Sequence, residues 1–248
     1  MIQTTDNVLS TDQTPWRLFD AGKDKEWCVL WLQGFHSNIQ GHTEGVARMA
    51  EATQTSFAML DYAGHGEHPM PLDDASRAKQ FQEVIEVYDR LREMGYQNII
   101  AIGGSFGGYM AALLAGERPL AGLVLRAPAN YPDEEFQLAY SDTSAARGDK
   151  AHYLYRQSIG QSYTNRAVEA VRQFSGATYV IEHQMDEVIN PSIPRSYFGA
   201  AQQGNYLVIP GLKHSPKLMP DPRPYFALIE SWLVTIVKAI QQNKKLEQ

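Results

Sequence analysis

A serine flanked by glycines stands at the centre of the most informative segment of this chain of 248 residues. Residues 103–107 read Gly-Gly-Ser-Phe-Gly and fit the pattern Gly-x-Ser-x-Gly around Ser105. The apolar run 99–102 leads directly into the pattern, and an apolar run of helical character, 109–114, follows it. A serine on a sharp strand-to-helix turn needs small neighbours, because strand and helix approach closely there while the hydroxyl points into the site. The segment therefore predicts Ser105 as a nucleophile.

A serine hydroxyl is a weak nucleophile at neutral pH unless a neighbouring imidazole takes its proton. Of the seven histidines, His214 lies directly after the last predicted strand, 206–209, and before the last predicted helix, 224–240. A loop at the end of a buried strand is a rigid mount for a base. We therefore expect His214 to act as the general base on Ser105.

The base in turn needs a carboxylate that accepts its second ring N–H and stabilises the imidazolium. Asp186 follows the predicted strand 178–181 within a short loop. Glu182 and Glu187 are neighbouring alternatives. The apolar residues 188–189 indicate that the loop turns inward after Asp186, which favours Asp186 as the third catalytic residue.

A tetrahedral oxyanion is stabilised by two donors aimed at one point, usually backbone N–H groups. One donor is expected from Phe106, directly after the nucleophile. The other is expected from the loop after the first long apolar strand, where Gly34 permits close approach of the backbone. We choose the N–H of Phe35 for this role, with His36 as the alternative.

The elements that must position these residues alternate along the chain. Short apolar runs bounded by Gly, Pro or Asp are separated by segments of helical period, which favours a mainly parallel sheet covered by helices. The strand candidates are 28–32, 57–60, 99–102, 122–125, 178–181 and 206–209. Helices are expected at 43–52, 81–94 and 224–240, with Gly95 as a C-terminal cap of the second. We therefore predict an α/β fold in which residues 1–248 form one domain.

The stretch 130–176 interrupts the alternation. It is polar, contains the acidic run 133–135 and is rich in tyrosine and phenylalanine. We interpret it as a small helical insertion or lid within the domain, in a position to bind an apolar substrate group. The alternative is that its aromatic side chains only attach the insertion to the body of the protein.

Composition excludes several classes of partner. The formal net charge of −6 disfavours nucleic acid and anionic membrane surfaces, which attract clustered Lys and Arg. The longest apolar stretch, 232–240, is too short to insert across a bilayer. The N-terminal residues lack the pattern of a secretory signal, and one cysteine, Cys28, fits a reducing compartment. We therefore expect a cytoplasmic protein that acts on a small-molecule acyl substrate. The oligomeric state stays open.

Two histidines, His65 and His68, are three positions apart, but the surrounding Gly and Pro residues predict a turn rather than a helical metal site. No phosphate-binding loop with a lysine is found. We expect no metal and no dissociable cofactor.

With these residues in place, the sequence resembles the α/β-hydrolase superfamily over nearly its whole length. The order Ser105, Asp186, His214 is that of this superfamily. Residues 33–35 resemble the His-Gly-Phe oxyanion loop of its esterase and lysophospholipase-like branch, although Gln33 replaces the histidine. Residues 61–67 resemble the Asp-x-x-Gly-x-Gly turn, and 184–191 resemble the acid loop, with Gln184 where glycine is common. The elbow around Ser105 is also similar to that of prolyl-oligopeptidase-type peptidases.

The resemblance implies the α/β-hydrolase fold and a serine hydrolase that cleaves a carboxylic ester or thioester through an acyl-enzyme. Two alternatives remain open. One is an acyl-peptide or amide hydrolase with the same triad, although no acidic pair is found that would bind a peptide amino group. The other is a binding protein that has kept the fold without the reaction.

Overall fold

The computed structural model describes residues 2–22, 25–160, 162–218 and 220–246, and within them eight strands form one sheet. The spatial order of the strands is β1-β2-β4-β3-β5-β6-β7-β8. The strands are β1 (Gln3–Val8), β2 (Pro15–Asp20), β3 (Trp27–Leu32), β4 (Ser56–Leu60), β5 (Asn98–Gly104), β6 (Gly122–Arg126), β7 (Ala177–His183) and β8 (Gln203–Ile209). From β4 to β8 all neighbouring strands are parallel, whereas β1 and β2 pair antiparallel at one edge. The predicted mostly parallel sheet is confirmed.

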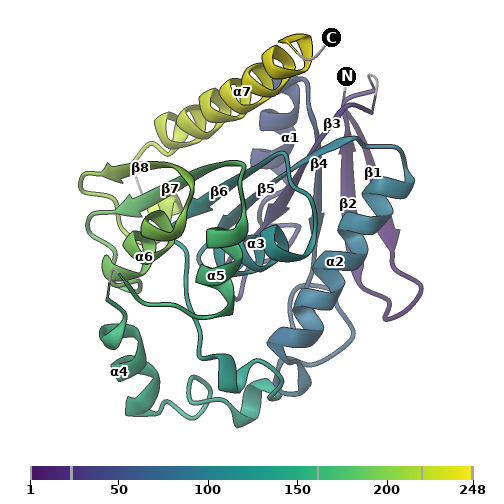
Figure 1. Cartoon of the computed structure of the whole chain (residues 1–248). Coiled ribbons are helices and arrows are strands. Elements are labelled where there is room, and N and C mark those ends of the chain that lie inside the picture. Colours follow the sequence, from purple (N-terminus) through teal and green to yellow (C-terminus); the bar gives the residue numbers. More distant parts are fainter. Residues whose placement is uncertain (1, 23–24, 161, 219, 247–248) are drawn as a thin grey trace.

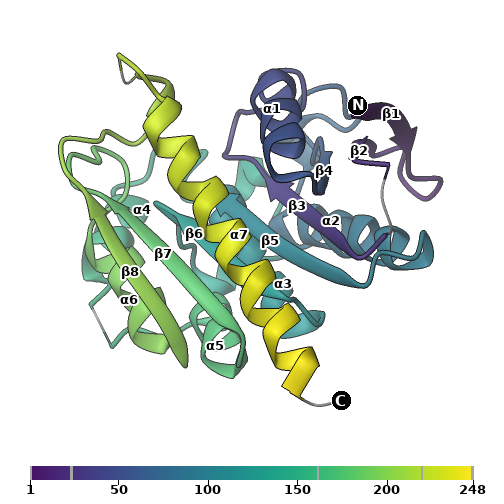
Figure 2. The same cartoon turned by 90° about the horizontal axis from the view of Figure 1, so that it is seen from above.

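Helices cover both faces of the sheet (Figures 1 and 2). One face carries α1 (Thr43–Thr53) and α7 (Arg223–Leu246), and the other carries α2 (Arg77–Glu93), α3 (Phe106–Glu117), α5 (Arg166–Gln173) and α6 (Ser192–Ala200). The short helix α4 (Lys150–Ser158) stands apart from this layer (Figure 1). None of the helices in the described part of the chain is long and apolar enough to cross a bilayer.

Burial on both faces explains the composition of the central strands. Every residue of β3 is buried, because helices pack above and below it. The helix α3 is apolar on all sides and is buried from Phe106 to Leu114, as expected for a helix enclosed by the sheet and other helices. This packing holds the turn between β5 and α3 in a fixed position.

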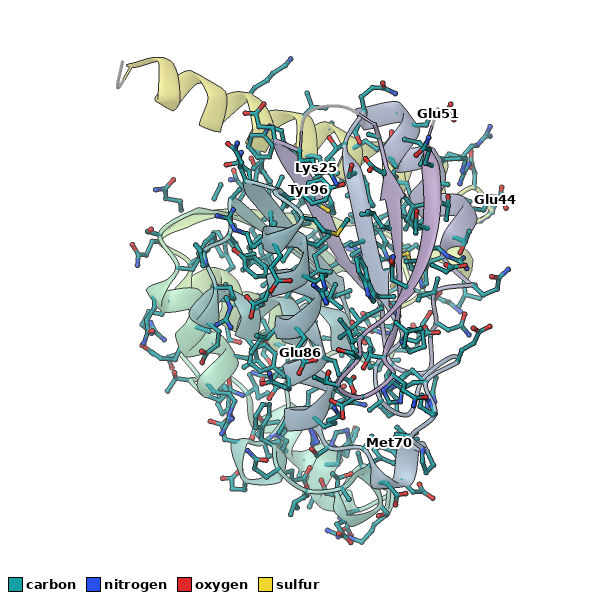
Figure 3. The ribbon with its side chains drawn as sticks, turned by 90° about the vertical axis from the view of Figure 1, so that its right-hand side faces the viewer. Lys25, Glu44, Glu51, Met70, Glu86 and Tyr96 are labelled. Atoms are coloured by element: carbon teal, nitrogen blue, oxygen red, sulfur yellow. The ribbon has the colours of Figure 1, made fainter. Side chains whose placement is uncertain are left out.

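Local signals fix the helix that precedes β5. The hydroxyl of Ser76 caps α2 by accepting a hydrogen bond from the N–H of Lys79 at 3.1 Å. After α2, Gly95 adopts a φ of 97°, so the predicted glycine cap is confirmed. Figure 3 shows Tyr96 beside Lys25, whose ammonium lies 5.0 Å from the centre of the Tyr96 ring. Next to this contact, Gln97 donates its N–H to the carbonyl of Lys25, which aligns the starts of β3 and β5.

Two strands and one α-helix of the described chain were not predicted. The strand β1 was not predicted because it is polar and exposed at the edge of the sheet. The strand β2 was not predicted because Arg17 interrupts its apolar residues. The helix α6 contains Pro194 and Gly199, which obscure its helical period, yet Pro194 is tolerated in the first turn.

The segment 130–176 divides into two parts in the structure. Its first part contains two short 3-10 helices, η2 (Asp133–Glu135) and η3 (Tyr140–Asp142), followed by α4. Its last part contains α5, whose apolar residues pack into the main core beside α3. Tyr131 and Tyr140 of the first part line the cavity at Ser105, whereas Phe136 packs against Phe81 of α2.

Candidate active site

Ser105 occupies a strained turn between β5 and α3. Its backbone has a φ of 53° and a ψ of −118°, a conformation that L-residues rarely adopt. Two glycines make the turn possible: a Cβ added at Gly103 would lie 2.0 Å from the carbonyl oxygen of Gly107, and one added at Gly107 would lie 2.0 Å from that of Leu32. The turn therefore presents the Ser105 hydroxyl at the carboxyl edge of the sheet.

The structure brings the three predicted side chains into one hydrogen-bonded chain. Nε2 of His214 lies 3.0 Å from Oγ of Ser105, and Nδ1 of His214 lies 2.8 Å from Oδ2 of Asp186. Because a carboxylate only accepts, Nδ1 carries the hydrogen and Nε2 is free to accept the serine proton. This is the geometry that activation of a serine by general-base catalysis requires.

Asp186 is held as a carboxylate. Its side chain is 3% exposed, and its second oxygen accepts the N–H groups of Val188 and Ile189, both at 2.8 Å. Burial raises the pKa of Asp186, but hydrogen bonds from His214 and from these N–H groups outweigh burial and leave the pKa below its ordinary value. Asp186 is therefore ionised at neutral pH.

The two alternative carboxylates have other partners. Glu182 is buried and forms an ion pair with Arg195, and it also accepts the hydroxyl of Tyr206. Glu187 is exposed and accepts the backbone N–H of His214 at 3.2 Å, so it contacts the loop and not the imidazole. Among Glu182, Asp186 and Glu187, the imidazole therefore bonds Asp186.

Sequence reasoning missed a second histidine that holds the His214 loop. His183, the last residue of β7, places Nδ1 2.9 Å from the carbonyl oxygen of Lys213 and 3.1 Å from that of His214. Nε2 of His183 lies 3.1 Å from the hydroxyl of Tyr225. Burial, followed by the nearby charge of Arg126, lowers the pKa of His183 to about 4. At neutral pH, His183 therefore donates from Nδ1 to the loop and accepts from Tyr225. Its place at the carboxyl end of a parallel strand was the available signal.

The predicted oxyanion donors lie beside Ser105. The N–H of Phe106 is the first of α3, where no carbonyl of a preceding helical turn is present to accept it. The loop after β3 approaches from the other side: a Cβ added at Gly34 would lie 3.6 Å from Cβ of Ser105. Phe35 follows Gly34, and its ring packs edge-on against that of Phe106 at 5.7 Å. The backbone of both predicted donors thus adjoins the nucleophile.

Two cavities meet at Ser105 and His214. The larger, the aromatic cavity, has a volume of about 370 Å³, and its lining includes Phe35, Phe106, Tyr131 and Tyr140. The smaller, of about 300 Å³, lies against the ends of β6 and β7. No group of three or more His, Cys, Asp or Glu side chains suited to a metal ion occurs among the residues that the structure describes.

The comparisons with known proteins agree with this architecture. Residues 23–158 match the hydrolase family described as serine aminopeptidase, S33. An uncharacterized protein of Mycobacterium tuberculosis (strain ATCC 25618 / H37Rv) is 25% identical over 182 residues, which are 72% of this chain and 59% of the relative. A carboxylesterase of Bacillus subtilis (strain 168) is 32% identical over 123 residues, 49% of each chain. The matched part thus spans only about half to three-fifths of these curated relatives.

Solved structures show the same fold at low sequence identity. Est1E from Butyrivibrio proteoclasticus, solved with bound ferulic acid, superposes with a TM-score of 0.72 at 14% identity and covers 94% of this chain and 99% of its own. A monoacylglycerol lipase from Paleococcus ferrophilus gives a TM-score of 0.66 at 15% identity and covers 95% and 99% of the two chains. With more than half of its length matched, this chain has the α/β-hydrolase fold and belongs to the serine aminopeptidase S33 family of hydrolases.

Proposed function

We propose that this protein is a serine hydrolase that cleaves a carboxylic ester or thioester through an acyl-enzyme on Ser105. The observation that carries the proposal is the hydrogen-bonded chain from Ser105 through His214 to the buried carboxylate of Asp186. The elbow conformation of Ser105 and the carboxylesterase relative support the same reading.

In the first half-reaction, Oγ of Ser105 attacks the substrate carbonyl while Nε2 of His214 takes the hydroxyl proton. The Asp186 carboxylate, which accepts Nδ1–H, stabilises the imidazolium as it forms. The backbone N–H groups of Phe106 and Phe35 are proposed to bind the oxyanion. His214 then returns the proton to the leaving alcohol or thiol, and the acyl group stays on Ser105.

In the second half-reaction, water replaces the leaving group. His214 takes a proton from the water molecule, the resulting hydroxide attacks the acyl carbon, and the bond to Oγ breaks with return of the proton to Ser105. The carboxylic acid leaves and the enzyme is restored. The scheme uses the three side chains and the two backbone N–H groups of this chain.

The aromatic cavity is proposed to bind an apolar part of the substrate. Residues of the segment 130–176 form one side of it, including Tyr131, Tyr140 and His152, which is the basis for proposing that this segment is a lid. The rings of Tyr131 and Phe106 lie 5.8 Å apart in an edge-to-face arrangement. The two rings provide apolar surface next to the nucleophile.

The family's description raises the alternative of an aminopeptidase with the same triad. An aminopeptidase must bind the α-ammonium group of its substrate, for which a carboxylate is the natural partner. Among the described residues that line the two cavities none is Asp or Glu, whereas Arg77, Arg126 and Arg156 are present. The charge of the site therefore favours an ester or thioester over a peptide with a free amino terminus.

A panel of short- and medium-chain esters, thioesters and aminoacyl amides tests the proposal on the wild type and on Ser105→Ala. The wild type is expected to hydrolyse esters or thioesters, and the variant to lose at least about a thousandfold in kcat, because triad residues act as a unit. Equal rates in the two proteins would contradict Ser105 as nucleophile. Cleavage of the amides alone would favour the aminopeptidase.

A further inference from the structure

The smaller cavity beside Ser105 carries a feature that ester hydrolysis by the triad does not use. It lies at the carboxyl edge of the sheet and is lined by Arg126 and His183, the last residues of β6 and β7, together with His36 and the two reacting side chains Ser105 and His214. A substrate bound at Ser105 therefore has access to this cavity as well as to the aromatic one.

Arg126 is held firmly next to the nucleophile. Its backbone carbonyl accepts the N–H of Ser105 at 3.0 Å, and its side chain reaches Gly104, since a Cβ added there would lie 2.6 Å from Nη2. The guanidinium lies over the ring of Trp31 at 4.5 Å and near the ring of Tyr225 at 5.6 Å. Arg126 is only 9% exposed, so its charge is largely removed from solvent.

This buried cation has no anionic partner within the described chain. Neither Nε nor Nη1 of Arg126 has a hydrogen-bond acceptor there, and no carboxylate of the described residues lies within ion-pair distance of it. Arg77 and Arg195, in contrast, are paired with Glu135 and Glu182. Aromatic faces attract the charge but do not accept the N–H groups in the plane of the guanidinium. Burying an unpaired charge lowers the stability of the fold, so a structural role alone does not explain why Arg126 is placed here.

The surroundings keep the cavity positive. No Asp or Glu is among the described residues that line it, and the Asp186 carboxylate lies behind the His214 imidazole. His183 adds a polar wall without a second charge, because it is neutral at pH 7 and its ring nitrogens are engaged by the loop and Tyr225. Among the described residues that line the cavity, Arg126 is therefore the one permanent positive charge.

We propose that the Arg126 cavity is a subsite for an anionic group carried by the substrate, a carboxylate or a phosphate located a few bonds from the scissile ester. The inference rests on the proposed function and narrows its substrate to acidic esters. The guanidinium suits both anions as a fixed positive charge, and Nη2 is the donor open to the cavity, because Nε and Nη1 are enclosed by the protein. The apolar remainder of the substrate would occupy the aromatic cavity.

Matched pairs of esters that differ only in charge test the subsite. The carboxylate arm compares monoethyl succinate, glutarate and adipate with the ethyl ester amides of the same acids. The phosphate arm compares 2-acetoxyethyl phosphate with its neutral dimethyl ester. For each pair, the ratio of kcat/KM for the anionic ester to that for the neutral ester is measured by chromatography of the released acid.

The wild type is expected to prefer at least one anionic ester by about 10- to 100-fold in kcat/KM. This ratio corresponds to the free energy of a hydrogen bond to a charged group. Arg126→Met is expected to lose this preference, and Arg126→Lys to retain part of it. Arg90→Met, which removes an exposed cation paired with Glu93, is the control for net charge and is expected to keep the wild-type ratio. The ratio cancels any general loss of activity in a variant.

Preference in the carboxylate arm or in the phosphate arm identifies the source of the anion and supports the subsite. A wild type that hydrolyses both members of every pair equally would overturn the subsite and leave the serine hydrolase intact. A wild type that hydrolyses no ester and leaves Ser105 unreactive would overturn both proposals.

Discussion

At the scale of single residues, the candidate site depends on how Asp186 is tied down. Two backbone N–H groups and the His214 imidazole share its carboxylate, so the side chain has little freedom to leave the imidazole. The imidazole is thereby fixed in the tautomer that leaves Nε2 open toward Ser105. The Asp186 carboxylate therefore orients the His214 imidazole toward Ser105, in addition to holding it close.

Asp186→Asn is expected to lower kcat by roughly 10³- to 10⁴-fold, because the amide favours the wrong tautomer and does not stabilise the imidazolium. Steady-state kinetics on the best ester of the panel measure the effect. Glu187→Gln is the matched control: Glu187 accepts the backbone N–H of His214 and does not bond its imidazole, so the loss of activity is expected to be far smaller. A larger loss in Glu187→Gln than in Asp186→Asn would reverse the assignment of the acid.

The sequence was sufficient to predict which three side chains meet, since each follows an apolar strand and parallel strands end at one edge of the sheet. It did not reveal His183 or Arg126 as neighbours of the site. Both stand at strand ends, but their importance comes from contacts with Tyr225 and Trp31, which are distant in the chain. Such contacts depend on packing and are not encoded in local spacing.

At the scale of elements, the elbow depends on the close packing of β3, β5 and α3. The positive φ of Ser105 persists because strand and helix on either side leave no room to relax. Glycines at 103 and 107 are what allow this approach. The elements therefore hold the nucleophile in a conformation that an isolated chain would avoid.

Gly107→Ala is expected to destabilise the fold by about 3 kcal/mol or more, because the new methyl group would overlap the backbone of β3. Gly45→Ala on α1 is the control. A Cβ there meets nothing within 4 Å, and alanine is the better helix former, so a gain of about 0.5–1 kcal/mol is expected. Urea unfolding of both variants measures the difference. Equal stability of the two variants would show that the elbow tolerates a larger residue.

Element prediction was accurate where composition matched burial. Continuous apolar runs identified the strands from β3 to β7, which are buried on both faces, and the run 206–209 identified β8, which is partly exposed at the other edge of the sheet. The edge strand β1 was missed because it is polar and exposed, and β2, which lies between β1 and β4, was missed because Arg17 interrupts its apolar residues. The helix α6 was missed because Pro194 and Gly199 lower its helix propensity. It forms because tertiary packing outweighs that low propensity.

At the scale of the whole molecule, burial of histidines links stability to pH. Burial is the main cause that lowers the pKa of His65 and brings the pKa of both His152 and His183 to about 4. In the unfolded chain these side chains titrate near pH 6.5. Between pH 6.5 and 4 the unfolded chain therefore binds protons that the folded chain does not, and stability falls as the pH falls.

For His183, which is 3% exposed, the loss between pH 7 and pH 5 is expected to be on the order of 2 kcal/mol. His183→Gln keeps an N–H donor but does not titrate, so its unfolding free energy is expected to depend less steeply on pH over this range. Urea unfolding of the wild type and the variant at pH 7 and pH 5 measures the two slopes. Identical slopes would mean that His183 does not contribute through its protonation.

The proposed reaction requires Ser105 to be an activated nucleophile. Reaction of the wild type and of Ser105→Ala with a fluorophosphonate, followed by intact mass and peptide mapping, tests it directly. One phosphonyl adduct is expected on the peptide that contains Ser105, and no adduct on the variant. A well-folded wild type that stays unlabelled, or an adduct that persists in Ser105→Ala, would contradict it.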